Sequence, residues 1–425
     1  MVFPRTPASV LRALTVFLVI GFLAFSGAAP LDAAEKKKKK SRKNFIPSES
    51  VGKKLMKIQE FMEEEQWEEA LGIITPLTQK KRLKKFDKAN LYMFQGFNLG
   101  ALERYDETLV AFENALAIDY LPDSATQQLK YNLGQLYLGQ QNYDRAIELF
   151  EDWLANAEKP DAQASFMITI AYVGKDDWPS ALVWARKSVD LSASPVENRL
   201  RLQLAAEFQN GNMPEVLETL KTLATLFPKK DYYLQLAHGY SQVGQEEDAL
   251  ALLELAYLQN FLDKERDLTN LTQRYLYHSL PWPGAKVMQK GLEDEIIETN
   301  SENLELYANS LLHAREYDMA IGPLTEAAET SEDGDLYHRV AQVHIEVENW
   351  KSARKALEKA VQKGSLRDEG SVQLLLGIAN FNEKRYVSAR KAFNEAAKNE
   401  RNADSASKWL EHVERASSAN ESQQS

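Results

Sequence analysis

Cysteine is absent from the 425 residues of the chain. Its absence excludes disulfide bonds, thiolate metal sites and cysteine nucleophiles, and also the lipid-attachment cysteine of bacterial lipoproteins. Basic residues are in the minority, with 51 Lys and Arg against 62 Asp and Glu, which gives a formal net charge of −11. A nucleic-acid-binding chain needs a basic stripe to displace counterions from phosphates, so this charge argues against a nucleic-acid partner.

The common catalytic and metal-binding motifs are missing too. The sequence has no glycine-rich phosphate loop ending in Lys-Ser/Thr, no His-Glu-x-x-His and no Gly-x-Ser-x-Gly. Of its six histidines, His313 and His338 could approach one another, but two imidazoles without a third ligand make a poor metal site. We therefore expect no catalytic residue, no cofactor and no bound metal, and we expect that the protein is not an enzyme.

The first 34 residues predict a targeting segment. Arg5 and Arg12 precede an apolar run over residues 13–25, and small residues follow. This order is typical of a secretory signal peptide, with cleavage near Ala33 or Ala34 and the mature protein in the periplasm. The apolar run is shorter than the roughly 20 residues that cross a bilayer. The alternative is an uncleaved signal that anchors the protein in the inner membrane.

A basic leader follows the predicted cleavage site. Residues 35–50 contain Lys36–Lys40, Arg42 and Lys43, and a second basic cluster lies at residues 80–85. Blocks of like charge repel and do not fold, so the leader is expected to be a disordered linker. The alternative is that it binds an anionic membrane surface, where each Lys or Arg contributes about 1 kcal/mol.

The stretch 130–154 predicts one helical hairpin. Apolar or small residues recur at separations of three and four, which places them on one face of each of two helices. These residues are Leu133, Gly134 and Tyr137 in the first helix and Ala146, Phe150 and Trp153 in the second. Gly134 and Ala146 are small, and two helices approach closely only where no large side chain intervenes.

The same spacing recurs ten times along the chain. The predicted hairpins begin near Val51, Ala89, Gln127, Ala162, Glu197, Lys230, Glu265, Ser301, Gly334 and Gly370. The small residue that opens the second helix recurs as Ala70, Thr108, Ala146, Ala181, Val216, Ala249, Gly284, Ala320, Ala353 and Ala389. A repeated hairpin cannot bury its apolar face alone, so the repeats must stack.

This spacing resembles the tetratricopeptide repeat, although Trp153 departs from the small residue usual at the twenty-seventh position. The resemblance implies an all-α fold, a right-handed solenoid of about ten repeats over residues 51–403. Residues 404–417 carry Trp409, Leu410 and Val413 on one face, and they are expected to form a capping helix. Residues 418–425 are expected to be a disordered tail.

The resemblance also implies a partner-binding surface. In such arrays the concave face is lined by fixed positions of each first helix, and partner proteins bind there. Carried over to this chain, the positions give Met93, Phe97, Tyr131, Gln135, Phe166, Ile170, Arg201, Phe208, Leu234 and His238. An exposed apolar face of this kind marks an interaction site. The alternative is that tight curvature buries these side chains against the next repeat.

A narrower resemblance rests on the lysine-rich leader, the Trp-bearing last helix and the segment Pro281-Trp282-Pro283-Gly284. Together these features resemble the periplasmic tetratricopeptide protein that accompanies TonB, ExbB and ExbD in some Gram-negative bacteria. This resemblance implies a non-enzymatic adaptor of an energy-transduction complex, with membrane-complex subunits as partners. The alternative is an assembly or quality-control factor for outer-membrane or secreted proteins.

Overall fold

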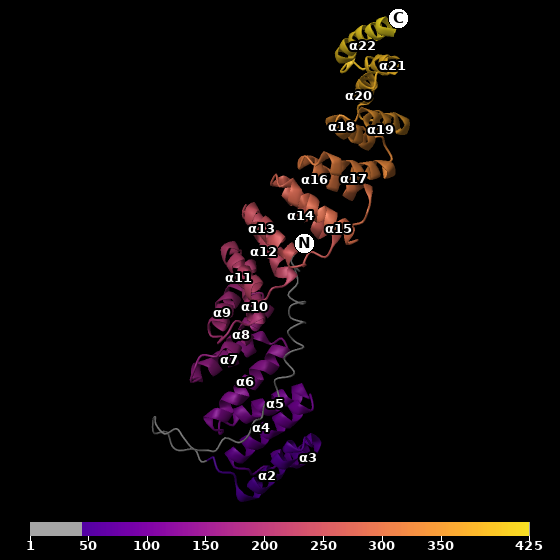
Figure 1. The fold of residues 1–425 in the computed structure, drawn as a ribbon. Coiled ribbons are helices and arrows are strands. Elements are labelled where there is room, and N and C mark those ends of the chain that lie inside the picture. Colours follow the sequence, from indigo (N-terminus) through magenta and orange to yellow (C-terminus); the bar gives the residue numbers. More distant parts are fainter. Residues whose placement is uncertain (1–44, 425) are drawn as a thin grey trace. The chain divides into compact units, whose positions relative to one another are not determined.

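The computed structural model describes residues 45–424, with side chains through residue 418. All regular structure in this part of the chain is α-helical and consists of ten helical hairpins followed by a single helix, α22 (Figure 1). The all-α repeat fold predicted from the sequence is therefore confirmed. None of these helices has the length and apolarity needed to cross a bilayer.

The described chain divides into two compact units, the first ending at Pro228 and the second beginning at Lys229. In the first unit the hairpins stack in chain order, each packing on the next. They are α2 (Glu49–Glu63) with α3 (Trp67–Thr78), α4 (Lys85–Ala101) with α5 (Tyr105–Ala117), α6 (Asp123–Gly139) with α7 (Tyr143–Asn156), α8 (Ala162–Gly174) with α9 (Trp178–Asp190), and α10 (Glu197–Gln209) with α11 (Met213–Leu226).

The second unit has five hairpins and the last helix. They are α12 (Lys230–Gln242) with α13 (Glu246–Leu258), α14 (Glu265–Tyr277) with α15 (Pro281–Glu293), α16 (Ser301–His313) with α17 (Tyr317–Thr330), α18 (Asp335–Glu346) with α19 (Trp350–Lys363), α20 (Glu369–Asn382) with α21 (Tyr386–Ala396), and α22 (Ala403–Gln424). Five of the ten predicted hairpin starts coincide with the observed helix starts: Ala162, Glu197, Lys230, Glu265 and Ser301.

The turn inside each hairpin has the same backbone conformation. In α6–α7, the Gln141 N–H donates to the Leu138 carbonyl at 3.1 Å and the Asn142 N–H donates to the Tyr137 carbonyl at 2.8 Å. This pair of bonds closes a helix with one left-handed residue. The left-handed residues are Glu65, Glu103, Gln141, Asp176, Gly211, Gly244, Ser279, Arg315, Glu348 and Lys384. The shared turn explains why the hairpins repeat so regularly.

The rows of small residues lie where the two helices of a hairpin meet. All ten residues that open the second helices are buried. A Cβ on Gly134 would lie 2.9 Å from the ring of Phe150, and one on Gly96 would lie 2.4 Å from the ring of Phe112. The helices therefore approach closely at these glycines, as predicted for Gly134. Trp153 is accommodated because it stays half-buried and its ring lies 5.2 Å from that of Tyr131.

The start of the described chain corrects one predicted boundary. The sequence places residues up to 50 in a disordered leader, but α2 begins at Glu49. The Ser48 N–H and hydroxyl donate to the Asp87 carboxylate at 2.9 and 2.6 Å, and the Phe45 ring lies 5.8 Å from that of Phe86. These contacts hold the segment 45–48 against α4. The signal peptide predicted at 1–34 and the lysines and arginine of residues 36–43 lie outside the described residues.

The end of the chain differs from the sequence expectation in a similar way. Helix α22 packs Trp409 flat on Phe393, with ring centroids 5.6 Å apart, and Val413 is fully buried. It thereby covers the apolar face of the last hairpin. The helix runs on to Gln424, whereas the sequence predicts a disordered tail from residue 418. No glycine or proline occurs between residues 403 and 424 to end the helix.

Candidate partner-binding surfaces

The residues predicted to line the concave face lie on five first helices. In the first unit, α4 carries Met93 and Phe97, α6 carries Tyr131 and Gln135, α8 carries Phe166 and Ile170, and α10 carries Arg201 and Phe208. Leu234 and His238 lie on α12, in the second unit. We describe the two units separately.

Phe166 and Ile170 are part of the core. Their side chains are only 9% and 5% exposed, and both belong to the apolar cluster that fills the middle of the first unit. Helix α8 is apolar on nearly every side, and a helix of this composition is buried all round. For these two residues the structure therefore favours the alternative in which neighbouring repeats bury them.

Met93, Phe97 and Tyr131 are half-buried and pack against the same core. The Phe97 ring meets the Phe112 ring edge-on at 5.2 Å, and the Tyr131 ring lies 5.5 Å from that of Phe150. Burial, with a smaller contribution from the nearby Asp161 carboxylate, raises the pKa of Tyr131 to about 12. The Phe97 and Tyr131 rings are thus held by the core, and Tyr131 keeps part of its surface exposed.

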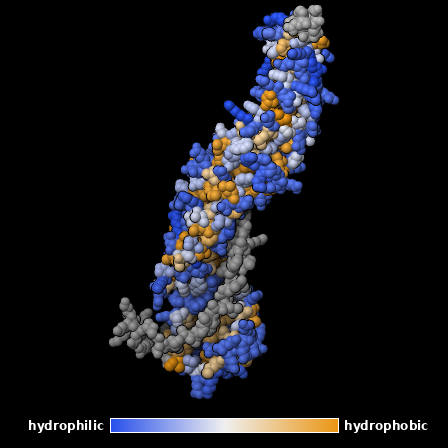
Figure 2. Space-filling model, viewed as in Figure 1, coloured by the Kyte–Doolittle hydropathy of each residue, from blue (hydrophilic) through white to orange (hydrophobic). Residues whose placement is uncertain are grey.

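The remaining predicted residues are mostly polar or peripheral. Gln135 is half-buried on α6, Arg201 is exposed on α10, and Phe208 is half-buried. On α12, Leu234 is half-buried and His238 is exposed, with its Nε2 3.0 Å from the Gln242 side-chain nitrogen. In the face shown in Figure 2, hydrophobic side chains form small patches among hydrophilic ones rather than one wide strip.

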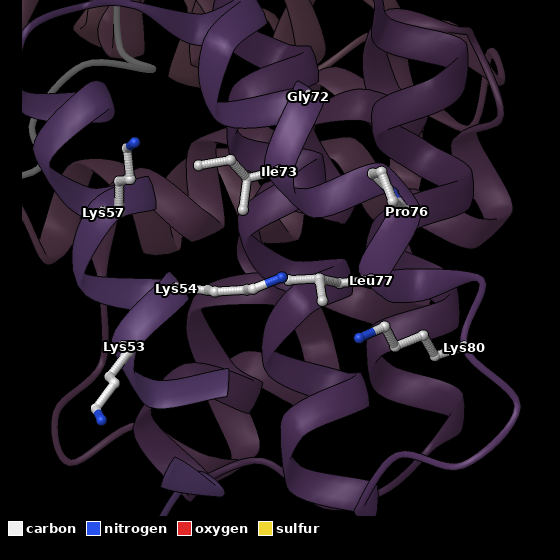
Figure 3. A pocket seen from close by; sticks show the side chains of 8 residues that line it. All are labelled: Lys53, Lys54, Lys57, Gly72, Ile73, Pro76, Leu77 and Lys80. Atoms are coloured by element: carbon white, nitrogen blue, oxygen red, sulfur yellow. The ribbon is translucent and has the colours of Figure 1, made fainter. Parts of the chain in front are cut away.

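The sequence analysis missed a groove on the first hairpin, between α2 and α3. We call it the lysine groove, and its volume is about 380 Å³. Figure 3 shows its lining: Lys53, Lys54 and Lys57 from α2, Gly72, Ile73, Pro76 and Leu77 from α3, and Lys80 just after α3. Three lysines within about one turn of α2 are the sequence signal that could have revealed it.

A second surface missed from the sequence is the turn between α14 and α15. Tyr277, Leu280 and Trp282 are 78%, 45% and 40% exposed there. The Lys286 ammonium lies 4.7 Å from the centre of the Trp282 ring and covers part of it. Three exposed apolar side chains in one turn form a small apolar patch on the second unit.

No group of three or more His, Asp or Glu side chains able to hold a metal ion occurs among residues 45–424. His338 and His344 are both partly buried, and this burial lowers their pKa.

The family model described as tetratricopeptide repeat matches residues 86–163, 131–194 and 340–406. This chain carries tetratricopeptide repeats. The matches fall on hairpins of both units and include the hairpin 130–154 that set the predicted spacing. Proteins built from these repeats generally serve as non-enzymatic scaffolds for protein partners.

Solved structures that match this chain include two described as tetratricopeptide repeat (TPR) proteins. A TPR protein from Parabacteroides merdae is 13% identical, with a TM-score of 0.37, and the match covers 78% of this chain and 99% of that one. YrrB, a TPR protein with an unusual peptide-binding site, is 20% identical, with a TM-score of 0.33 and coverage of 39% and 83%. The structure of Naa15/Naa10 bound to HypK-THB is 13% identical, with a TM-score of 0.41, and the match covers 85% of this chain and 66% of that one. No curated protein sequence matches the chain.

Proposed function

We propose that this protein is an exported scaffold that holds partner proteins on the first helices of its repeats, without catalysis. The observation that carries the proposal is the pair of half-buried rings on consecutive first helices, Phe97 on α4 and Tyr131 on α6. Each ring is held by an edge contact to a fully buried phenylalanine behind it, Phe112 or Phe150.

Such rings suit partner binding because their positions are set before the partner arrives. A side chain that is already held loses little rotamer freedom on binding, and aromatic anchors commonly dominate the binding energy of an interface. Gln135 lies one turn along α6 from Tyr131 and adds a polar contact beside the ring. The buried Phe166 and Ile170 support this surface from within rather than touching the partner.

The proposed location is the periplasm, and the proposed partner is a subunit of a TonB-type energy-transduction complex. The signal-like pattern of residues 1–34 supports export, and the resemblance stated above supports the partner. The basic residues 36–43 would bring the body of the protein to an anionic membrane surface. Sequencing the N-terminus of protein from a periplasmic extract tests export, and a chain that begins at Met1 in the membrane fraction would refute cleavage.

Site-specific crosslinking tests the partner surface, and the absence of native cysteine makes an introduced cysteine unique. We would attach a photo-crosslinker to Gln135→Cys and, as a matched control, to Glu151→Cys, an exposed position on the second helix α7. Crosslinking in cells should join Gln135→Cys, but not Glu151→Cys, to a subunit of the TonB-type complex. A crosslink to an outer-membrane or secreted protein would support the assembly-factor alternative, and equal crosslinking at both positions would refute the surface.

A further inference from the structure

Four lysines line the lysine groove together with Ile73 and Leu77. In Figure 3, Lys54 and Lys80 extend toward one another from opposite sides, next to Leu77 and below Ile73. A Cβ added at Gly72 would meet nothing within 4 Å, so the groove is open at this point. Pro76 has no N–H to donate to the Gly72 carbonyl one turn earlier, which leaves a backbone acceptor without its helical donor in the groove.

The positive charge of the groove is poorly balanced. Within the described part of the chain, Lys53 pairs with Glu49 at 3.1 Å, while Lys54, Lys57 and Lys80 form no ion pair with a carboxylate. The Lys57 ammonium lies 5.4 Å from the centre of the Phe61 ring, which does not neutralise it. Several ammonium groups around one concave surface attract an acidic partner.

Part of the groove lining is an accessible apolar side chain. Ile73 follows the small residue Ala70 by three positions, and the equivalent residue of the second hairpin is Ala111. Ala111 is 3% exposed because it packs against Leu71 of the first hairpin and Leu99 of its own hairpin. Leu149, at the same position of the third hairpin, is 5% exposed. Ile73 is half-exposed, as are Trp184, Leu252 and Pro323 at the same place of later hairpins, so an apolar side chain remains accessible in the lysine groove.

We propose that the lysine groove binds an acidic amphipathic helix of a partner protein. The apolar face of that helix covers Ile73, and its carboxylates pair with Lys54, Lys57 and Lys80. The lysine groove shares no residue with the first-helix surface proposed above, so each proposal can be tested without the other.

The charges in the sequence argue against the protein's own N-terminal segment as the occupant. Residues 1–44 contain nine basic and two acidic residues, so they share the sign of the groove. The shape argues against a lipid surface, because Ile73 and Leu77 line a concave site that a flat layer of headgroups does not reach.

The probes for the test are two synthetic amphipathic peptides with leucine at positions i, i+3, i+4 and i+7. One carries glutamate beside the leucines and the other carries lysine. Their binding to the full chain is measured by fluorescence anisotropy. The variant pair Lys54→Glu with Lys57→Glu should weaken binding of the glutamate peptide by roughly tenfold or more, and it should gain binding of the lysine peptide.

The matched control is Lys81→Glu with Lys84→Glu, which changes the net charge equally at exposed lysines outside the groove lining. This pair should weaken binding much less. A second variant, Gly72→Phe, fills the open part of the groove without changing any charge and should also weaken binding by roughly tenfold.

Three results would overturn the proposal. Equal weakening by both lysine pairs would mean general charge attraction, and equal binding of the two peptides would mean that charge plays no part. The third result is that phosphatidylglycerol vesicles displace the glutamate peptide, and that the Lys54→Glu, Lys57→Glu variant loses this displacement. It would identify an anionic membrane as the occupant.

Discussion

Replacing Gly96 by alanine tests the close helix approach on which each hairpin depends. The new Cβ would lie 2.4 Å from two atoms of the Phe112 ring, closer than real Cβ contacts. The Phe112 ring has little room to move, because it is fully buried and the Phe97 ring meets it at 5.2 Å. One of the two helices must therefore shift.

The size of the effect follows from two opposing contributions. Alanine in place of glycine inside a helix stabilises it by about 1 kcal/mol. Overpacking a well-filled core costs about 1–3 kcal/mol. Gly96→Ala should therefore change the free energy of unfolding by between about zero and a loss of about 2 kcal/mol. A Cβ added at Gly72, in α3, would meet nothing within 4 Å, so Gly72→Ala should show only the stabilising contribution of alanine. The free energies of unfolding of the two variants should therefore differ by about 1–3 kcal/mol.

The assay is denaturant unfolding followed by circular dichroism, combined with hydrogen exchange, because a stack of repeats opens locally rather than in one step. Protection should fall first in α4 and α5. In a Phe112→Leu background the cost of Gly96→Ala should shrink, since the ring that it strikes is gone. If Gly96→Ala stabilises the protein as much as Gly72→Ala, the helices are further apart than the structure has them.

Three further predictions concern the turns, the half-buried Tyr131 and the small-residue row. Gln141 has a φ of 61°, so Gln141→Gly should stabilise the protein by up to about 1 kcal/mol, and Gly244→Ala, at φ 78°, should destabilise it by a similar amount in the same unfolding assay. Because the pKa of Tyr131 is raised, its contribution to stability is complete below pH 10 and is lost as the pH rises through about 12. In an absorbance titration of tyrosinate, the unaltered protein should therefore ionise one phenol near pH 12 that is missing from the Tyr131→Phe variant. Ala353 is fully buried, and Ala353→Leu should lower the free energy of unfolding by about 1–3 kcal/mol. In hydrogen exchange the second unit should then lose protection before the first, whereas uniform loss of protection would mean a single cooperative domain.

The repeat itself could be predicted from the sequence because its cause is local. The two helices of a hairpin can pack closely only if small residues, such as Gly134 and Ala146, lie where they cross. This requirement places small residues at a regular interval in the sequence. The period depends on the turn as well, yet the turn leaves no such trace. Eight of its ten left-handed residues are not glycine, so residue type alone does not reveal the conformation.

The candidate sites were harder to predict because exposure depends on neighbouring hairpins. Phe97 and Ile170 occupy the same position of their first helices, but Phe97 stays half-buried and Ile170 is buried. Helix α8 is apolar on all sides and lies within the stack, and this environment is a property of the packed unit rather than of one position. The lysine groove was missed because the sequence does not show which side chains of α2 and α3 enclose a concave surface.

The two proposed surfaces differ in how mutation affects them. Phe97 and Tyr131 also pack against the core, so changing either ring lowers stability together with any binding, and a loss of binding alone is not informative there. Lys54 and Lys57 are exposed, and reversing their charge leaves the buried residues of α2 in place. Partner binding that fails in the lysine variant while its melting temperature is unchanged therefore reports on the groove itself. Binding to the first helices is better tested by crosslinking from Gln135, which adds a probe beside the rings and removes neither.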